Sequence, residues 1–223
     1  MNKTNNHNSE QAAMERLKQI RGEIDNIDGK LLDLLNKRAG QCLEVGNLKS
    51  KFRETVFKPF REKEVFDRLK KANPGILPDD HLHSIYREIL SSSRRLQQPQ
   101  KVVYLGPEGT FSYFAGIEYL GHSADFVACR DIAEVFHSVS SREAELGIVP
   151  LENSLQGSVG QVLDMFLTHD IYIQAELFCK ISHALLSSAS DLASVKTVYS
   201  HPQALEQCAR WLRIHLSDAR VVP

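Results

Sequence analysis

The amino-acid sequence predicts a multidomain chain in which an all-α part of three helices precedes an α/β part. Residues 11–50 contain no proline and keep apolar residues at helical spacing. From residue 101 onward, short β-branched strands alternate with loops and helical stretches, the pattern of an α/β domain. Between the two parts lies Gln97-Gln98-Pro99-Gln100, which has the composition of a linker.

The composition sets limits on the function. The 223 residues include 27 basic and 28 acidic side chains, which argues against non-specific nucleic-acid binding. The four cysteines form no CxxC pair, which favours reduced thiols in a cytoplasmic protein over a disulfide framework or a zinc site. No apolar run approaches the roughly 18 residues that a membrane span needs. The polar residues 1–10 predict a short disordered start.

Residues 11–50 are predicted to form one long helix. At 1.5 Å per residue it extends roughly 60 Å, too long for a single small domain to cover. We therefore expect a partner helix from a second copy of the chain, and hence a homodimer. The apolar stripe of this helix consists of Ile20, Ile24, Ile27, Leu31, Leu34, Val45 and Leu48.

Two shorter helices follow the long one. Pro59 suits the first turn of a helix, which then ends at Asn73-Pro74-Gly75. Pro78, Asp79 and Asp80 open the third helix, because a proline and acidic side chains are favourable at a helix N-terminus. The linker closes this third helix.

Cations interrupt the apolar stripe of the long helix. Arg38 lies within the stripe, and an unpaired guanidinium costs several kcal/mol to bury, so it needs a carboxylate or an anionic ligand. Lys49 lies about 20° away from Arg38 around the helix axis, so the two cations share a face. Arg21 lies roughly 25 Å from Arg38 along the same axis. If Arg21 belongs to such a site, it most simply reaches the site of a second subunit.

Polar residues also lie on the apolar faces of the two shorter helices. Glu62 precedes the apolar residue Val65 by three positions, and Ser93 and Gln97 continue the stripe of Ile89 at four-residue steps. Each residue alone has an ordinary explanation, such as a salt bridge or exposure to solvent. Together with the two cations, they predict a binding site in one helical core.

Taken together, these residues resemble the all-helical chorismate mutases, in the form that begins the bifunctional chorismate mutase and prephenate dehydratase proteins of phenylalanine synthesis. The resemblance covers residues 11–98, through IRGEIDNIDGKLLDLLNKRAGQCLEVGNLK, KPFREKEVFDRL and IYREILSSSRRLQ. It implies an intertwined homodimer of three-helix chains that rearranges chorismate to prephenate. Residues 99–101 would link this domain to the next.

The resemblance implies that arginines clamp the substrate. Arg21 of the neighbouring subunit and Arg38 would bind the carboxylates of chorismate, with Arg61 supporting them. Arginine suits this role because it binds carboxylates in bidentate fashion. The rearrangement is intramolecular, so no nucleophile, metal or cofactor is expected, and catalysis reduces to holding a dianion compact and stabilising developing charge.

Further roles follow from the same resemblance. Lys49 and Gln97 would donate hydrogen bonds to the breaking ether oxygen, and Glu62 would accept one from the ring hydroxyl. Ser93 corresponds to a residue that lines the substrate. Lys58 departs from the family pattern, because some relatives have an acidic residue there that assists with the hydroxyl.

Residues 102–223 resemble the prephenate dehydratase domain of the same proteins. Three loops that follow strands carry the resemblance, GPEGTFS at 106–112, PLENSLQGSV at 150–159 and SHPQAL at 200–205. Each places hydroxyls and backbone N–H groups at a helix start, a ready anion site. The candidate residues for binding prephenate are Thr110, Ser112, Glu152, Asn153, Ser154, Ser200 and His201.

The sequence also departs from this family. It contains neither the Thr-Arg-Phe triplet that relatives carry late in the domain nor their phenylalanine-sensing domain. We therefore expect a truncated chain whose α/β domain, of the periplasmic-binding-protein-like kind, is incomplete, so that dehydratase activity is doubtful. A strand is expected at 180–186, and loose packing is expected at 208–223.

Two other functions are compatible with parts of the sequence. One is a non-catalytic module that dimerises through the long helix or binds a small acid. The other is an effector-binding regulatory protein built on the α/β half. A simple dimer interface would prefer apolar residues at positions 38, 62 and 97, so the polar residues there favour an enzyme.

Overall fold

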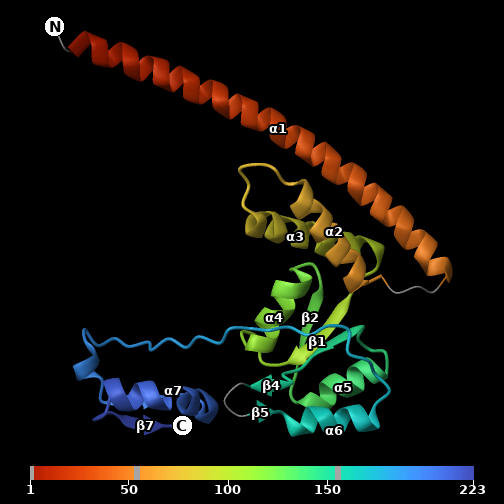
Figure 1. Ribbon diagram of the computed structural model, residues 1–223, viewed down its shortest axis with the longest axis vertical. Coiled ribbons are helices and arrows are strands. Elements are labelled where there is room, and N and C mark those ends of the chain that lie inside the picture. The colour runs from red at the N-terminus through yellow and green to blue at the C-terminus, as the bar shows by residue number, and fades with distance from the viewer. Residues whose placement is uncertain (1–2, 53–55, 154–156) are drawn as a thin grey trace. The chain divides into compact units, whose positions relative to one another are not determined.

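The computed structural model describes residues 3–52, 56–153 and 157–223 (Figure 1). The chain forms two units. Unit 1 comprises Met1–Val102 and Ile117–Val127, and unit 2 comprises Val103–Gly116 and Ala128–Pro223. The prediction of helical and α/β halves is confirmed, but residues 117–127, which follow the linker, belong to the helical unit.

The predicted long helix is confirmed as α1, Lys3–Phe52. It begins inside the segment 1–10, for which the sequence predicted disorder. An existing helix adds residues without the cost of a new nucleus, so a polar segment can continue it. No helix in the described part of the chain has the length and apolarity needed to cross a membrane.

Helices α2, Pro59–Ala72, and α3, Asp79–Gln97, complete the helical unit. Proline stands at the start of α2 as predicted, and Pro78 precedes an acidic first turn in α3. Both α1 and α2 pack against α3. The buried residues of α3 are Leu90, Ser91, Ser93 and Arg94, so an unusual share of polar side chains lies inside this unit.

A three-stranded sheet begins the α/β part. Strands β1 (Lys101–Leu105), β2 (Asp125–Cys129) and β3 (Leu146–Ile148) lie in the order β2-β1-β3. Helices α4 (Phe111–Leu120) and α5 (Ile132–Ser140) connect them. The core of unit 2 beside this sheet contains Val103, Cys129, Val135 and Ala144.

Smaller elements complete unit 2. A short antiparallel pair joins β4 (Glu152–Asn153) and β5 (Gly157–Ser158), and α6 (Gly160–Thr168) follows. The buried Val162 of α6 packs with Ile132 and Phe136 in a second core cluster.

The last elements are a 3-10 turn at Leu192–Ser194, β6 (Thr197–Tyr199), α7 (Pro202–His215) and β7 (Arg220–Val222). Strands β6 and β7 pair in parallel, and Val198, Leu212 and Leu216 form a core cluster beneath them. The expectation of loose packing at 208–223 is therefore wrong.

The expected strand at 180–186 is absent, because residues 170–187 form neither helix nor strand. A strand is stable only when it pairs with a neighbour, and in the described part of the chain this segment pairs with none.

Candidate active site

Arg38 reaches from α1 to α3. Its Nη1 donates to the Ser93 hydroxyl and lies 3.7 Å from Cys42 Sγ. The buried Ser93 hydroxyl in turn donates to the Ile89 carbonyl at 2.6 Å. Because a hydroxyl is neutral, the bond to Ser93 leaves the guanidinium charge for an anionic ligand. The sequence predicts a carboxylate or an anionic ligand beside Arg38, and the Glu62 carboxylate pairs with Arg94 instead.

Gln97 lies at a close approach of α1 and α3. A Cβ at Gly46 of α1 would lie 3.0 Å from the backbone Cα and side chain of Gln97, so only glycine allows this approach without a shift. The Gln97 amide donates to the Ser93 carbonyl at 3.1 Å. Its Oε1 is buried without a hydrogen-bond partner among the described residues. A buried polar atom of this kind marks a place for a ligand or a water molecule.

Lys49 lies in the last turns of α1 and is half-buried. Its Nζ donates to the Val56 carbonyl at 3.2 Å, in the segment that leads into α2. Lys58 stands at the N-cap of α2, and its side chain is exposed and makes no capping bond.

The structure leaves two of the predicted arginines at the surface. Arg61 pairs with Glu64 at 2.9 Å, and both side chains are more than half exposed. Arg21 is exposed on α1, roughly 25 Å along the helix from Arg38. Within this one chain neither arginine joins the residues on α3.

Glu62 of α2 forms an ion pair with Arg94 of α3, a residue that the sequence analysis missed. Arg94 also donates to the Leu120 carbonyl, and its guanidinium carbon lies 5.3 Å from the centre of the Phe57 ring. The spacing of residues along α3 could have identified Arg94 as a buried charge. It lies four residues after Leu90, on the buried stripe of α3, where a charge requires a partner.

The pKa of the Tyr119 hydroxyl is affected by burial, by Glu62 and by Arg94. Burial raises the pKa of its hydroxyl above the usual value near 10.0. The nearby Glu62 carboxylate raises this pKa further, and Arg94 partly offsets the effect. Tyr119 also packs edge-on against Phe57, with 6.0 Å between the ring centres. The Phe57 ring and the Tyr119 phenol therefore lie near the Glu62–Arg94 pair.

These side chains form two groups that meet on α3. Arg38 and Gln97 gather around Ser93, and Glu62 pairs with the next residue, Arg94. Together with Lys49, they combine fixed cations, a carboxylate and a buried amide, which suits a small dianion that also carries a hydroxyl. No cluster of three or more His, Cys, Asp or Glu among the described residues could hold a metal ion.

In the α/β part, Thr110 caps α4. Its hydroxyl donates to the Leu105 carbonyl at 3.1 Å and accepts from the Tyr113 N–H at 3.4 Å. Ser112 lies half-buried in the first turn of α4. The Thr110 hydroxyl thus has an ordinary role in shaping its own loop.

The residues of the other two loops, at 150–159 and 200–205, also make local contacts. Glu152 is exposed and pairs with Ser158 in the β4–β5 register, where Asn153 pairs with Gly157. The predicted Ser154 lies outside the described residues.

His201 caps α7, accepting from the Gln203 N–H at 3.3 Å, and the Ser200 N–H donates to the Val222 carbonyl at 3.3 Å. No hydrogen bond among the described residues joins Thr110, Glu152 and His201.

The comparisons with known proteins agree with this division into a helical and an α/β part. The chorismate mutase type II model matches residues 20–98, and the prephenate dehydratase model matches residues 102–223. The chain therefore belongs to the prephenate dehydratase family and carries a region of the chorismate mutase type II family ahead of that domain.

Relatives that join both domains are similar over most of this chain. The bifunctional chorismate mutase/prephenate dehydratase of Aquifex aeolicus is 41% identical, over 94% of this chain and 59% of the relative. The protein of the same name from Stutzerimonas stutzeri is 40% identical, over 93% of this chain and 59% of the relative. The chain thus spans about 59% of the length of these curated relatives.

A solved prephenate dehydratase from Staphylococcus aureus is 32% identical, over 55% of this chain and 47% of that protein, with a TM-score of 0.48.

Proposed function

We propose that the chain rearranges chorismate to prephenate in phenylalanine biosynthesis. One observation carries this proposal. The region that matches the chorismate mutase family also joins Arg38, Ser93 and Gln97 across α1 and α3, and among the described residues the buried Gln97 Oε1 has no hydrogen-bond partner. Membership of an enzyme family, together with these polar residues, disfavours a non-catalytic dimerising or acid-binding module.

The proposed mechanism needs only positioning and charge. Arg38 would bind a substrate carboxylate, because its bond to Ser93 leaves its charge available. Lys49 and Gln97 would stabilise the negative charge that develops on the ether oxygen, as preorganised donors do. Glu62 would accept a hydrogen bond from the ring hydroxyl. Arg61 and Lys58 remain predicted substrate-binding residues, although their side chains are exposed in this chain.

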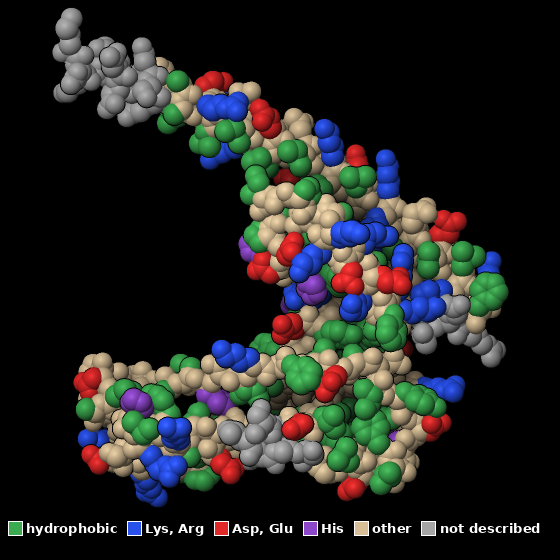
Figure 2. All heavy atoms as spheres, viewed as in Figure 1, with side chains coloured by type: hydrophobic (Ala, Val, Ile, Leu, Met, Phe, Trp, Pro, Cys, Tyr) green, Lys and Arg blue, Asp and Glu red, His purple; other side chains and the backbone are tan. Residues whose placement is uncertain are grey.

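The proposed enzyme is a homodimer whose active sites are shared between subunits. The predicted stripe on α1 supports this, because Ile24, Ile27 and Leu31 are each about half exposed. Figure 2 shows hydrophobic side chains at the surface along α1. Exposed apolar patches of this kind mark interaction sites. A second α1 would cover the stripe and bring its Arg21 to the site of its partner.

The α/β half would take prephenate as its substrate, to be converted to phenylpyruvate, CO2 and water. Its match to the dehydratase family supports this, with Thr110 and His201 at the starts of α4 and α7. The location predicted from the spacing of the cysteines is cytoplasmic, and none of the four cysteines, which all lie in the described part of the chain, forms a disulfide.

The experiment that tests these proposals incubates the purified chain with chorismate and quantifies chorismate, prephenate and phenylpyruvate separately. We expect prephenate to accumulate without phenylpyruvate. Phenylpyruvate formation would contradict the expectation for the second reaction. Unchanged chorismate would refute the mutase proposal and favour the dimerising module. Sedimentation velocity on the same sample should give a dimer, and a monomer with full activity would refute the shared site.

A further inference from the structure

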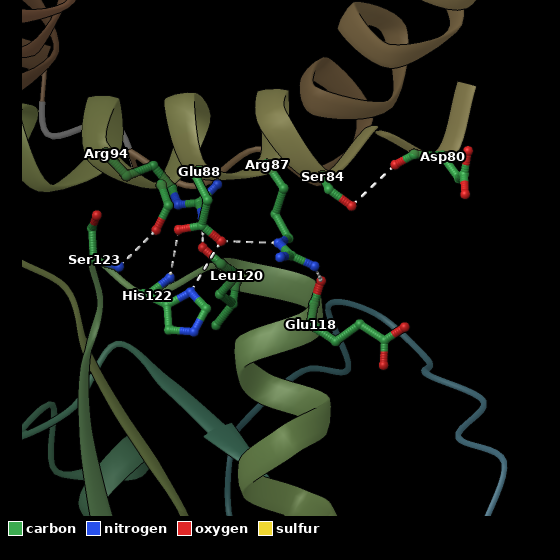
Figure 3. Close-up of polar contacts among 10 residues, drawn as sticks. Asp80, Ser84, Arg87, Glu88, Arg94, Glu118, Leu120, His122 and Ser123 are labelled. Carbon is green, nitrogen blue, oxygen red and sulfur yellow. Dashed lines mark hydrogen bonds and ion pairs between the residues drawn. The ribbon is translucent and has the colours of Figure 1, made fainter. Parts of the chain in front are cut away.

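Arg94 is the only charged residue that is buried among the described residues, with 4% of its surface exposed. Burying a guanidinium is costly unless every part of it has a partner. Here the partners come from three places, the Glu62 carboxylate on α2, the Leu120 carbonyl at the end of α4, and the face of the Phe57 ring. Figure 3 shows Arg94 on α3 with Leu120 among the polar contacts at the end of α4.

The ion pair restricts the Glu62 side chain. Glu62 bonds to Arg94 through Oε1 and is 19% exposed. A carboxylate has two oxygens, so Oε2 can still accept a hydrogen bond from a ligand hydroxyl. Without Arg94, a glutamate side chain has three rotatable bonds and no fixed direction here. The pair therefore orients the residue proposed to bind the substrate hydroxyl.

The Leu120 carbonyl is itself held firmly against α3. Gly121 follows it with a φ of +74°, and a Cβ there would lie 2.6 Å from the Ser91 Cβ. The N–H groups of His122 and Ser123 donate to Glu88 Oε2 and Ser91 Oγ at 3.1 Å and 3.0 Å, both on α3 (Figure 3). The segment after α4 is thus fixed along one face of α3.

We infer that Arg94 is a positioning residue for the rearrangement, which holds the Glu62 carboxylate while the Leu120 carbonyl holds Arg94. The inference rests on the proposed mutase function. It assigns part of the support of the mutase site to a segment that follows the linker, within the region matched by the dehydratase model. Arg94 does not touch the substrate in this arrangement and acts through Glu62 alone.

A purely structural ion pair would behave differently. Its loss would lower the unfolding free energy but leave kcat per folded chain near that of the parent, whichever of the two partners is changed. A positioning role requires that the effect of Arg94 depend on the Glu62 carboxylate, because an amide at that position cannot form the ion pair. A double-mutant cycle separates the two cases.

The cycle uses full-length chains with Arg94→Leu, Glu62→Gln and both changes, each checked by circular dichroism for its helix content. We expect Arg94→Leu alone to lower kcat about 10- to 50-fold, because small displacements of catalytic groups cost rates of this order. In the Glu62→Gln background the same change should lower kcat less than about twofold. Arg94→Lys should restore part of the rate by returning a cation.

The matched control is Arg95→Leu. Arg95 is the next residue on α3 and also contacts the segment after α4, through Asp125 at 2.6 Å and the Ser123 carbonyl at 2.9 Å. Its side chain is half exposed and, among the described residues, makes no hydrogen bond to Glu62, so the kcat of Arg95→Leu should stay within about twofold of the parent value.

Three outcomes would refute either the proposed mutase function or the positioning role of Arg94. A parent chain without chorismate turnover refutes the proposed function itself. An active parent with Arg94→Leu at full rate refutes the positioning role alone. Equal losses of kcat in both backgrounds would show that Arg94 acts independently of Glu62, which also refutes the positioning role. If Arg94→Leu does not fold, Arg94→Lys replaces it in the cycle, and equal effects in both backgrounds then decide against the inference.

Discussion

In unit 1, Arg38 and Glu62 bond to residues of α3 that lie 55 and 32 positions away in the sequence. In unit 2, Thr110 and His201 bond to backbone groups within five positions of themselves. Contacts across elements define a site only in the folded chain, whereas local contacts shape a loop whatever surrounds it. The polar residues Arg38 and Glu62 therefore connect different elements of the helical unit, whereas Thr110 and His201 act as separate caps in the α/β loops.

The largest expected effect on activity comes from Lys49→Ala in unit 1. The ammonium is proposed to stabilise charge in the transition state, so kcat should fall on the order of 10²-fold or more. Lys51→Ala is the matched control, because Lys51 is an exposed lysine in the last turn of the same helix. Steady-state chorismate consumption measures both. Near-normal turnover of Lys49→Ala would remove Lys49 from the site.

A pair of glycine substitutions compares packing in the two units. Gly121 and Gly109 both have positive φ, +74° and +86°, but only Gly121 lies against other residues. Gly121→Ala should cost roughly 2–4 kcal/mol in unfolding free energy, from backbone strain and a clash with Ser91.

Gly109→Ala should cost only about 1 kcal/mol, because no atom lies within 4 Å of its Cβ position. Urea unfolding followed by circular dichroism gives both values. Equal costs would mean that the approach of Gly121 to α3 does not contribute to stability.

Thr110→Ala tests the local role of a loop residue in unit 2. Loss of its helix cap should cost about 1 kcal/mol in unfolding free energy and leave chorismate turnover unchanged. Thr168→Ala, at an exposed threonine near the end of α6, should change stability by less than about 0.5 kcal/mol. A fall in chorismate turnover with Thr110→Ala would show that this loop is coupled to the mutase site.

The smallest expected effect concerns pH. Burial alone would raise the pKa of Glu88, but hydrogen bonds from the His122 backbone and ring and from Arg87 outweigh it and hold the pKa below its usual 4.5. A lowered pKa contributes stability above the ordinary value, and this contribution is lost as the pH falls through the folded-state value.

Glu88→Gln should therefore cost about 0.5 kcal/mol at pH 7, a small figure because the side chain is 39% exposed, and progressively less as the pH falls below 4.5. Urea unfolding of both chains across this range measures it. A cost that stays constant with pH would show that the Glu88 charge is not involved.

Periodicity predicted the helical unit well, for a physical reason. An α-helix places residues on a face by spacing alone, so the stripe that contains Arg38 could be assigned without a structure. Proline and acidic residues marked the starts of α2 and α3 because they meet the requirements of free N–H groups at a helix end. The polar character of Ser93 and Gln97 was visible in the same way.

The partner of Glu62 could not be predicted by the same means. Spacing places residues around one helix but does not say which face of α3 meets α2, or that the end of α4 would provide the Leu120 carbonyl. The strand expected at 180–186 failed for a related reason. A strand depends on a neighbour, and neighbours are a property of the whole fold.

The place of residues 117–127 has a consequence for how such proteins can be recombined. Linker composition alone would locate the exchange point for swapping domains between relatives at residues 99–101. A chain joined there would bring a foreign partner to Glu88, Ser91 and Arg94, whose bonds are to residues 120–123. No single backbone position divides the two units. Transfer of the helical domain to another protein would therefore have to include residues 117–127, or compensating changes would be needed on α3.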